Sequence, residues 1–135
     1  MIKHLPTAAG ALLGLLFLTS GLVVLLGLGP TPPPPPEGSP PAHFMAAFAP
    51  TGYLTFVKVL EVLGGGLVAV PRTRNLGLLV LGPILVNILA FHLFVTGGEG
   101  LFEPLLVLIV VLAAYLLWVE RRAFAGLVSG SARGR

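Results

Sequence analysis

Long apolar runs separated by short polar segments dominate the chain. A helix needs roughly 20 predominantly apolar residues to cross the hydrocarbon core of a bilayer. Four segments meet this requirement and are predicted to be spanning helices: residues 4–28, 51–70, 76–95 and 101–119. The first apolar run is longer than that of a usual secretory signal, so we expect it to be retained. The pattern predicts an all-α membrane protein, with residues 1–135 forming one four-transmembrane-helix bundle.

The composition agrees with a membrane location and excludes several other classes. Hydrophobic residues make up 56% of the chain and charged residues 10%, with a mean hydropathy of +0.99. Soluble domains carry about 25% charged residues, so this chain could not cover a globular surface in water. The absence of cysteine excludes disulfides, thiolate metal sites and Cys-ligated iron–sulfur clusters. Eight scattered Lys and Arg residues do not form the basic face that nucleic-acid binding requires.

The positions of Lys and Arg predict the orientation, because these residues accumulate in cytoplasmic loops. Lys and Arg flank the spans only before the first, between the second and third, and after the fourth. These residues are Lys3, Arg72, Arg74, Arg121, Arg122, Arg133 and Arg135. The sequence therefore predicts that both termini are cytoplasmic, in a cytoplasmic (inner) membrane of the bacterial type.

Two segments outside the spans have a biased composition. The sequence GPTPPPPPEGSPPAHF lies in the loop at residues 29–50. Prolines favour extended polyproline II, so we expect this loop to be a semi-rigid spacer on the non-cytoplasmic surface. The Gly-, Ser- and Arg-rich residues 125–135 are expected to be a flexible basic tail whose arginines suit anionic lipid headgroups.

A charged pair interrupts the second span. Lys58 and Glu61 each cost about 2.5–3.5 kcal/mol at the centre of a spanning helix if unpaired. Their i, i+3 spacing places them on one helix face, where they can neutralise each other. Counted at ~1.5 Å per residue, both lie roughly 10–15 Å below the outer membrane face. In the third span, Asn87 reaches the same depth and His92 lies roughly 5 Å from the outer end.

These four residues are candidates for an outer-half polar pocket: Lys58, Glu61, Asn87 and His92. Each also has a structural interpretation: the charged pair as a pin for helix register, Asn87 as an interhelical hydrogen-bonding group, and His92 as an interfacial residue. Ionisable groups in a span are functional candidates by default, and here several share one depth. The chain has no Asp, and Thr51 and Thr55 are the only hydroxyl residues expected near the cluster. No catalytic residue is assigned, and no metal site is expected because Lys58 would oppose a cation.

Two sequence segments resemble the DoxX family of small four-helix membrane proteins. They are YLTFVKVLEVLGGGLVAV, with K-x-x-E before a glycine, and GPILVNILAFHLF, with N-x-x-x-x-H. The resemblance covers roughly residues 4–122. It implies a four-helix bundle associated with redox systems, since some members resemble the membrane subunit of a thiosulfate:quinone oxidoreductase. Many members carry Asn or His near the exit of the first span, whereas residues 21–28 here are wholly apolar.

Three functions remain open at this point. The first is a non-catalytic accessory subunit of a membrane redox or respiratory assembly, with a larger membrane complex as its partner and no cofactor of its own. The second is a binding protein for a quinone or another small molecule, which would occupy the outer-half polar pocket. The third is a proton or solute conduit, for which the inner halves of the second and third spans offer no polar side chains.

Overall fold

The computed structural model describes residues 2–130, and every regular element in that range is helical. The elements are η1 (Ile2–His4), α1 (Leu5–Leu25), α2 (Pro40–Phe48), η2 (Ala49–Thr51), α3 (Tyr53–Ala69), α4 (Arg74–Ala90), the π-helix η3 (Phe91–Val95), α5 (Pro104–Val119) and α6 (Arg121–Val128). The prediction of an all-α fold is confirmed for these residues.

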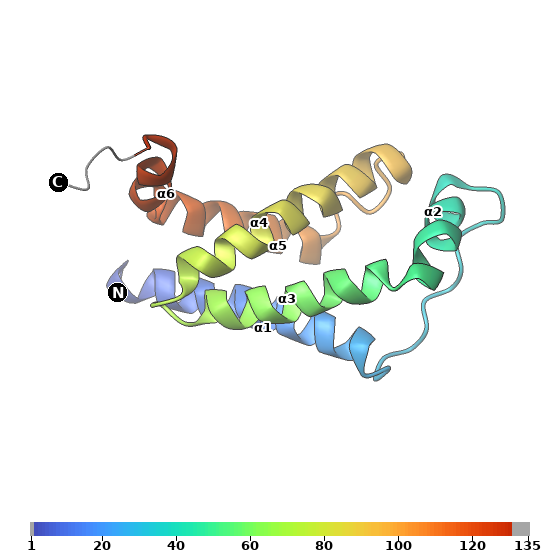
Figure 1. The fold of residues 1–135 in the computed structure, drawn as a ribbon, viewed down its shortest axis with the longest axis horizontal. Coiled ribbons are helices and arrows are strands. Elements are labelled where there is room, and N and C mark those ends of the chain that lie inside the picture. Colours follow the sequence, from blue (N-terminus) through green and yellow to red (C-terminus); the bar gives the residue numbers. More distant parts are fainter. Residues whose placement is uncertain (1, 131–135) are drawn as a thin grey trace.

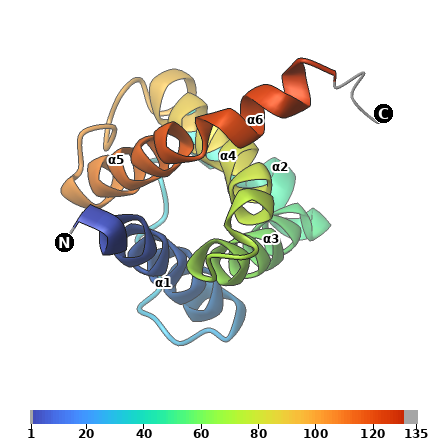
Figure 2. The same cartoon turned by 90° about the vertical axis from the view of Figure 1, so that its left-hand side faces the viewer.

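The four long helices, α1, α3, α4 and α5, run alongside one another (Figure 1). The start of α1, the α3–α4 connection and the corner between α5 and α6 lie at one end of the molecule, which we call the termini end. Helix α2 and the turn at residues 96–103 lie at the opposite end, the α2 end. Viewed along the helices, α1 lies between α3 and α5, and α4 packs against α3 (Figure 2).

Two to four helical units satisfy the requirements for a membrane span within the described residues. Ile2–Leu25 and Arg74–Val95 are each long and apolar enough on their own. The number rises to four if each of two bent helix pairs counts as one span. These pairs are Pro40–Thr51 with Tyr53–Ala69, bent by 82°, and Pro104–Val119 with Arg121–Val128, bent by 69°.

Part of the proline-rich loop is helical, which differs from the predicted spacer. Ser39 accepts a hydrogen bond from the Ala42 amide through its hydroxyl and caps α2. Prolines at the first two helical positions are tolerated there, because those amides have no partner within a helix. Gly52, with φ of 80°, then turns the chain into α3. The prediction of an extended loop therefore fails at residues 40–50, whereas the segment at 30–36 is irregular.

The chain after α5 also differs from the prediction. Helix α6 continues to Val128, where the sequence predicted a flexible tail from residue 125. The physical reason is that Phe124 packs against the hydrophobic core and holds the segment in place. The remainder of that predicted tail, with Arg133 and Arg135, lies in residues 131–135, outside the described residues.

Glycines bring α1 and α3 into close contact. A Cβ added at Gly14 would lie 2.5 Å from the Gly65 carbonyl oxygen, and one added at Gly65 would lie 2.9 Å from the Gly14 carbonyl oxygen. Neither backbone atom can move out of the way, so only glycine fits at these two positions. Close backbone approach of this kind strengthens van der Waals packing between helices where no hydrophobic driving force is available.

The hydrophobic core occupies the half of the molecule nearest the termini. Its buried side chains are Ala9, Leu13, Phe17, Val68, Leu78, Leu81, Ile84, Leu85, Ala113 and Leu116. Toward the α2 end lie residues 18–25, 53–62, 86–95 and 104–112, which we call the α2 half. Within the described residues, Glu61 is the one side chain of the α2 half that is buried, at 3% exposure. The close-packed core therefore ends at a carboxylate.

Candidate functional site

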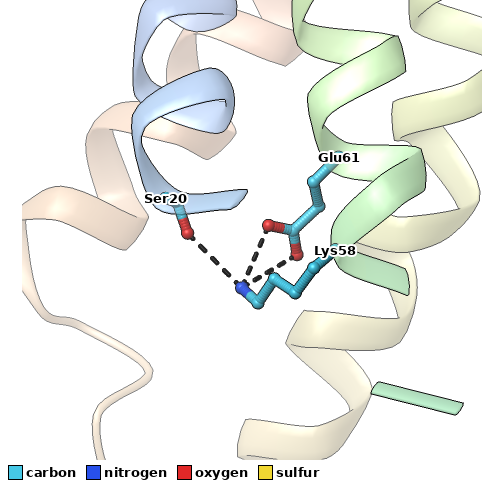
Figure 3. Close-up of polar contacts among 3 residues, drawn as sticks. All are labelled: Ser20, Lys58 and Glu61. Atoms are coloured by element: carbon cyan, nitrogen blue, oxygen red, sulfur yellow. Dashed lines mark hydrogen bonds and ion pairs between the residues drawn. The ribbon is translucent and has the colours of Figure 1, made fainter. Parts of the chain in front are cut away.

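The Lys58–Glu61 ion pair forms where the hydrophobic core ends. The Lys58 ammonium nitrogen (Nζ) lies 3.0 Å from one carboxylate oxygen of Glu61 and 3.3 Å from the other. It also donates to the Ser20 hydroxyl of α1 at 3.4 Å (Figure 3). The Lys58 side chain is 25% exposed and that of Glu61 is 4% exposed. The ammonium group thus bridges α3 to α1 and is the accessible member of the pair.

One ring nitrogen of His92 has a defined hydrogen-bond partner. Its Nδ1 lies 2.8 Å from the Ile88 carbonyl oxygen. A carbonyl can only accept, so Nδ1 donates, which assigns the proton of the neutral ring to Nδ1 and leaves a lone pair on Nε2. A Cβ built on Gly100 would lie 3.2 Å from His92 Cδ2 and 3.5 Å from Nε2. The Nε2 edge of the ring therefore faces Gly100, where a side chain would fit only if the ring moved by a few tenths of an ångström.

The backbone around His92 is irregular. Residues 91–95 form a π-helix, an element that occurs frequently at functional sites. The His92 carbonyl oxygen accepts hydrogen bonds from the Thr96 hydroxyl at 2.6 Å and from the Gly98 amide at 2.7 Å. Both bonds go to the same carbonyl group and tie the end of the π-helix to the turn at residues 96–98.

Two crevices flank these residues on opposite sides. The first, which we call the polar crevice, has a volume of about 190 Å³ and lies between α1, α3, the end of α4 and α5. Its polar lining consists of Ser20, Lys58, Glu61, His92 and Glu103. The second, the aromatic crevice, has a volume of about 230 Å³ and lies under α2. Its characteristic lining consists of Phe44, Met45, Tyr53, Phe91 and Asn87.

The ion pair and the histidine belong to both crevices. Lys58, Glu61 and His92 line each of them and form their common wall. Gly100 lines only the polar crevice, so the lone pair on His92 Nε2 faces that side. The polar crevice therefore offers hydrogen-bond donors from Lys58 and Ser20 and an acceptor from His92. Such a set can hold a small molecule that carries both a carbonyl and a hydroxyl group.

The structure brings together three of the four residues proposed from the sequence. Lys58, Glu61 and His92 come together at the common wall. Asn87 is exposed and lines only the aromatic crevice, away from the Ser20 side. Within residues 2–130, no group of three His, Cys, Asp or Glu side chains is placed to hold a metal ion.

Sequence reasoning missed two residues of the polar crevice. Ser20 contributes a hydroxyl from α1, whereas Thr51 and Thr55 were expected to be the only hydroxyl residues near the cluster. That expectation was wrong because it did not consider the depth of Ser20, which immediately precedes the apolar residues 21–28. The second is Glu103, which immediately precedes α5. Counting ~1.5 Å per residue back from the end of α1 would have placed Ser20 near Lys58.

A second ion pair lies at the termini end. Arg74 Nη1 is 3.4 Å from Glu120 Oε1, and this contact joins the start of α4 to the corner between α5 and α6. Arg74 is only 5% exposed, and its Nε and Nη2 are buried without a hydrogen-bond partner. The sequence indicated only that Arg74 lies in a basic loop. Its burial follows from Gly10, where an added Cβ would lie 3.2 Å from Arg74 Nε.

The chain is similar to an uncharacterized bacterial protein. It is 36% identical over 76 residues to the uncharacterized protein YwoB of Bacillus subtilis (strain 168), a match that covers 56% of this chain and 47% of that protein. The matched region thus spans about half the length of the relative. No protein-family profile matches the chain, and no solved structure does.

Proposed function

We propose that the chain is an integral membrane protein that crosses the bilayer four times with both termini in the cytoplasm. The apolar side chains exposed along α1, α3, α4 and α5 support this proposal, because lipid would cover them. The basic side chains Lys3, Arg72, Arg121 and Arg122 are exposed near the termini end, as the distribution of positive charge in membrane proteins requires. In this orientation the α2 end is non-cytoplasmic and the polar crevice opens in the outer half of the membrane.

The function that the site supports best is the binding of a small lipophilic molecule with a hydrogen-bonding head, and we propose a quinone or its quinol. One observation carries this proposal: Glu61 is buried where the hydrophobic core ends, next to a crevice rather than in close-packed surroundings. A buried ion pair contributes little net stability, and apolar residues of similar volume can often replace it without loss. Stability alone therefore does not explain a Lys and a Glu at this depth.

The hydrogen-bonding groups of the polar crevice match both redox forms of such a head. Lys58 and Ser20 can donate to a quinone carbonyl. The lone pair on His92 Nε2 can accept from a quinol hydroxyl. The proposal concerns binding only, since any electron transfer would require a donor supplied by another protein. It is in keeping with the proposed relationship to the DoxX family, which the K-x-x-E pair in α3 and Asn87 and His92 in and after α4 support.

Equilibrium binding of menadione, a naphthoquinone without a tail, tests the proposal on protein purified in a mild detergent. We expect Ser20→Ala to weaken binding of menadione, and His92→Phe to weaken binding of its quinol, menadiol, by about tenfold each, which corresponds to the loss of one hydrogen bond of about 1.4 kcal/mol. Asn87→Leu serves as the matched control, because Asn87 lines only the aromatic crevice. Unchanged affinity in both crevice variants, or a loss only in the control, would refute binding in the polar crevice.

A second proposed function, a non-catalytic accessory subunit of a membrane redox or respiratory complex, is favoured by a different observation. The proline segment at residues 30–36 is irregular and almost wholly exposed at the α2 end. Exposed proline-rich segments are common recognition sites for partner proteins. Gentle extraction from native membranes followed by mass spectrometry should recover redox subunits in stoichiometric amounts. Replacing Pro32 to Pro36 with Gly and Ser should release those partners, and retention of the partners would contradict this function.

A further inference from the structure

A third crevice lies next to the polar crevice and is entirely apolar. It has a volume of about 240 Å³ and lies between α1, α4 and α5. Its lining ranges from the fully buried Leu13 to Val86 and Leu117, which are 67% and 41% exposed. The crevice therefore extends from the interior to the outer surface between α4 and α5. We call it the apolar crevice.

The apolar and polar crevices are neighbours along the helices. Phe17 of α1 lines both. On α5, Ile109 lines the polar crevice and the next residue, Val110, lines the apolar crevice. On α4, Leu85 belongs to the apolar crevice and Ile88, one helical turn later, to the polar crevice. The two crevices therefore meet at Phe17, which forms a wall of both.

We propose that the apolar crevice binds the hydrocarbon tail of the ligand whose head occupies the polar crevice. The ligand class is then an amphiphile, specifically a quinone or quinol with an isoprenoid tail, and Phe17 lies where head and tail join. This inference rests on the proposed function, because it places the head beside Lys58 and His92. From the α2 end inward, the lining is first polar and then apolar, which matches the head and the tail of such a molecule.

The open side of the apolar crevice indicates the route of entry. Val86 and Leu117 lie on α4 and α5, on the surface that faces lipid in the proposed orientation. A tailed quinone dissolved in the bilayer can therefore enter sideways between α4 and α5, without passing through water. The apolar crevice adds no hydrogen bond, since its lining is hydrocarbon, so it selects for the tail through apolar contact and shape.

Two probes and one pair of matched variants test the inference. The probes are menadione, which has only the head, and its geranyl-tailed analogue. Ala114→Phe places a ring at the wall of the apolar crevice, whereas Ala11→Phe makes the same change at another exposed alanine, on α1, outside the three crevices. We expect Ala114→Phe to weaken binding of the tailed probe at least tenfold and to leave menadione binding unchanged. Ala11→Phe should change neither affinity.

The outcomes separate the two proposals. If menadione fails to bind the wild-type protein while the tailed probe binds and Ala114→Phe blocks it, the tail inference holds and the tail-less head alone is insufficient. If neither probe binds, the proposed function and the inference both fail. If menadione binds and Ala114→Phe leaves the tailed probe unaffected, only the tail inference fails. A phospholipid that copurifies with the wild-type protein, is lost in Ala114→Phe and resists displacement by the tailed probe would also overturn it.

A second variant covers the case in which Ala114→Phe does not fold. Val86→Phe narrows the same crevice from the opposite wall, on α4. We expect the same selective loss of the tailed probe, with a monodisperse elution profile and wild-type helix content. Unchanged binding of the tailed probe to folded Val86→Phe would overturn the inference.

Discussion

Removing one charged side chain of the Lys58–Glu61 pair should destabilise the protein much more than removing both. The two charges lie 3.0 Å apart, which at an effective dielectric constant of about 20 corresponds to an attraction of about 5–6 kcal/mol. Much of this attraction offsets the desolvation of the two groups. In Lys58→Met the carboxylate remains buried, on a side chain that is 4% exposed, with no countercharge. Removing one partner of a buried pair costs about 3–5 kcal/mol.

The exposure of Lys58 places the expected value at the low end of that range. Because its side chain is 25% exposed, water weakens the pair in the folded state. We therefore expect Lys58→Met to lower the free energy of unfolding by about 3 kcal/mol. The double variant Lys58→Met/Glu61→Met leaves no unpaired charge and should lie within about 1 kcal/mol of the wild type.

Thermal unfolding in a mild detergent, followed by circular dichroism, measures these differences. For a chain of this size, 1 kcal/mol corresponds to roughly 3–5 °C, so Lys58→Met should lower Tm by about 10 °C. Thr55→Met, an exposed change one turn earlier on α3, is the control for the added methionine. A Tm for Lys58→Met equal to that of the control would refute the reasoning, because the carboxylate would then be solvated in the folded state. A double variant less stable than Lys58→Met would refute it as well.

Three further predictions concern the scaffold. Gly14→Ala should destabilise the protein by about 1–3 kcal/mol, because its Cβ would lie 2.5 Å from the Gly65 carbonyl oxygen. Gly66→Ala is the control in the same thermal assay and should be neutral or stabilising, because no atom lies within 4 Å of its added Cβ. Glu120→Ala should lower the free energy of unfolding by about 1–3 kcal/mol, because it leaves buried Arg74 without its carboxylate partner. Glu37→Ala, at an exposed position, is the control, and an equal Tm of the two variants would contradict the burial of Arg74. Ser39→Ala should remove the cap of α2 at about 1 kcal/mol and speed hydrogen exchange of the α2 amides alone, so unchanged exchange there would rule out the cap.

The sequence indicated the long helices well because their signal is a long, predominantly apolar run. It missed α2, since a run of prolines predicts an extended chain, while a single cap at Ser39 is enough to start a helix after it. Helix α6 was missed for a related reason: its few helical residues depend on the contact between Phe124 and the core. Both helices depend on local or tertiary contacts that hydropathy does not record.

The candidate site was predictable in part. The i, i+3 spacing places Lys58 and Glu61 together on any helix, and counting depth brought His92 near them. The π-helical turn that orients His92 leaves no comparable pattern in the sequence. The depth of Ser20 was not considered, because a single hydroxyl in an apolar helix can donate to a backbone carbonyl one turn earlier and need not mark a site. The unpartnered nitrogens of Arg74 could be recognised only from the packing of α4 against Gly10.

The measurement that tests the central claim most directly is the binding of tailed and tail-less naphthoquinone to the double variant Lys58→Met/Glu61→Met. This variant should be as stable as the wild type, so a change in binding reports on the polar crevice rather than on folding. The account predicts wild-type helix content and Tm together with at least a tenfold loss of affinity for whichever probe the wild type binds. Wild-type affinity in the folded double variant would contradict the account and would leave the charged pair with a purely structural role.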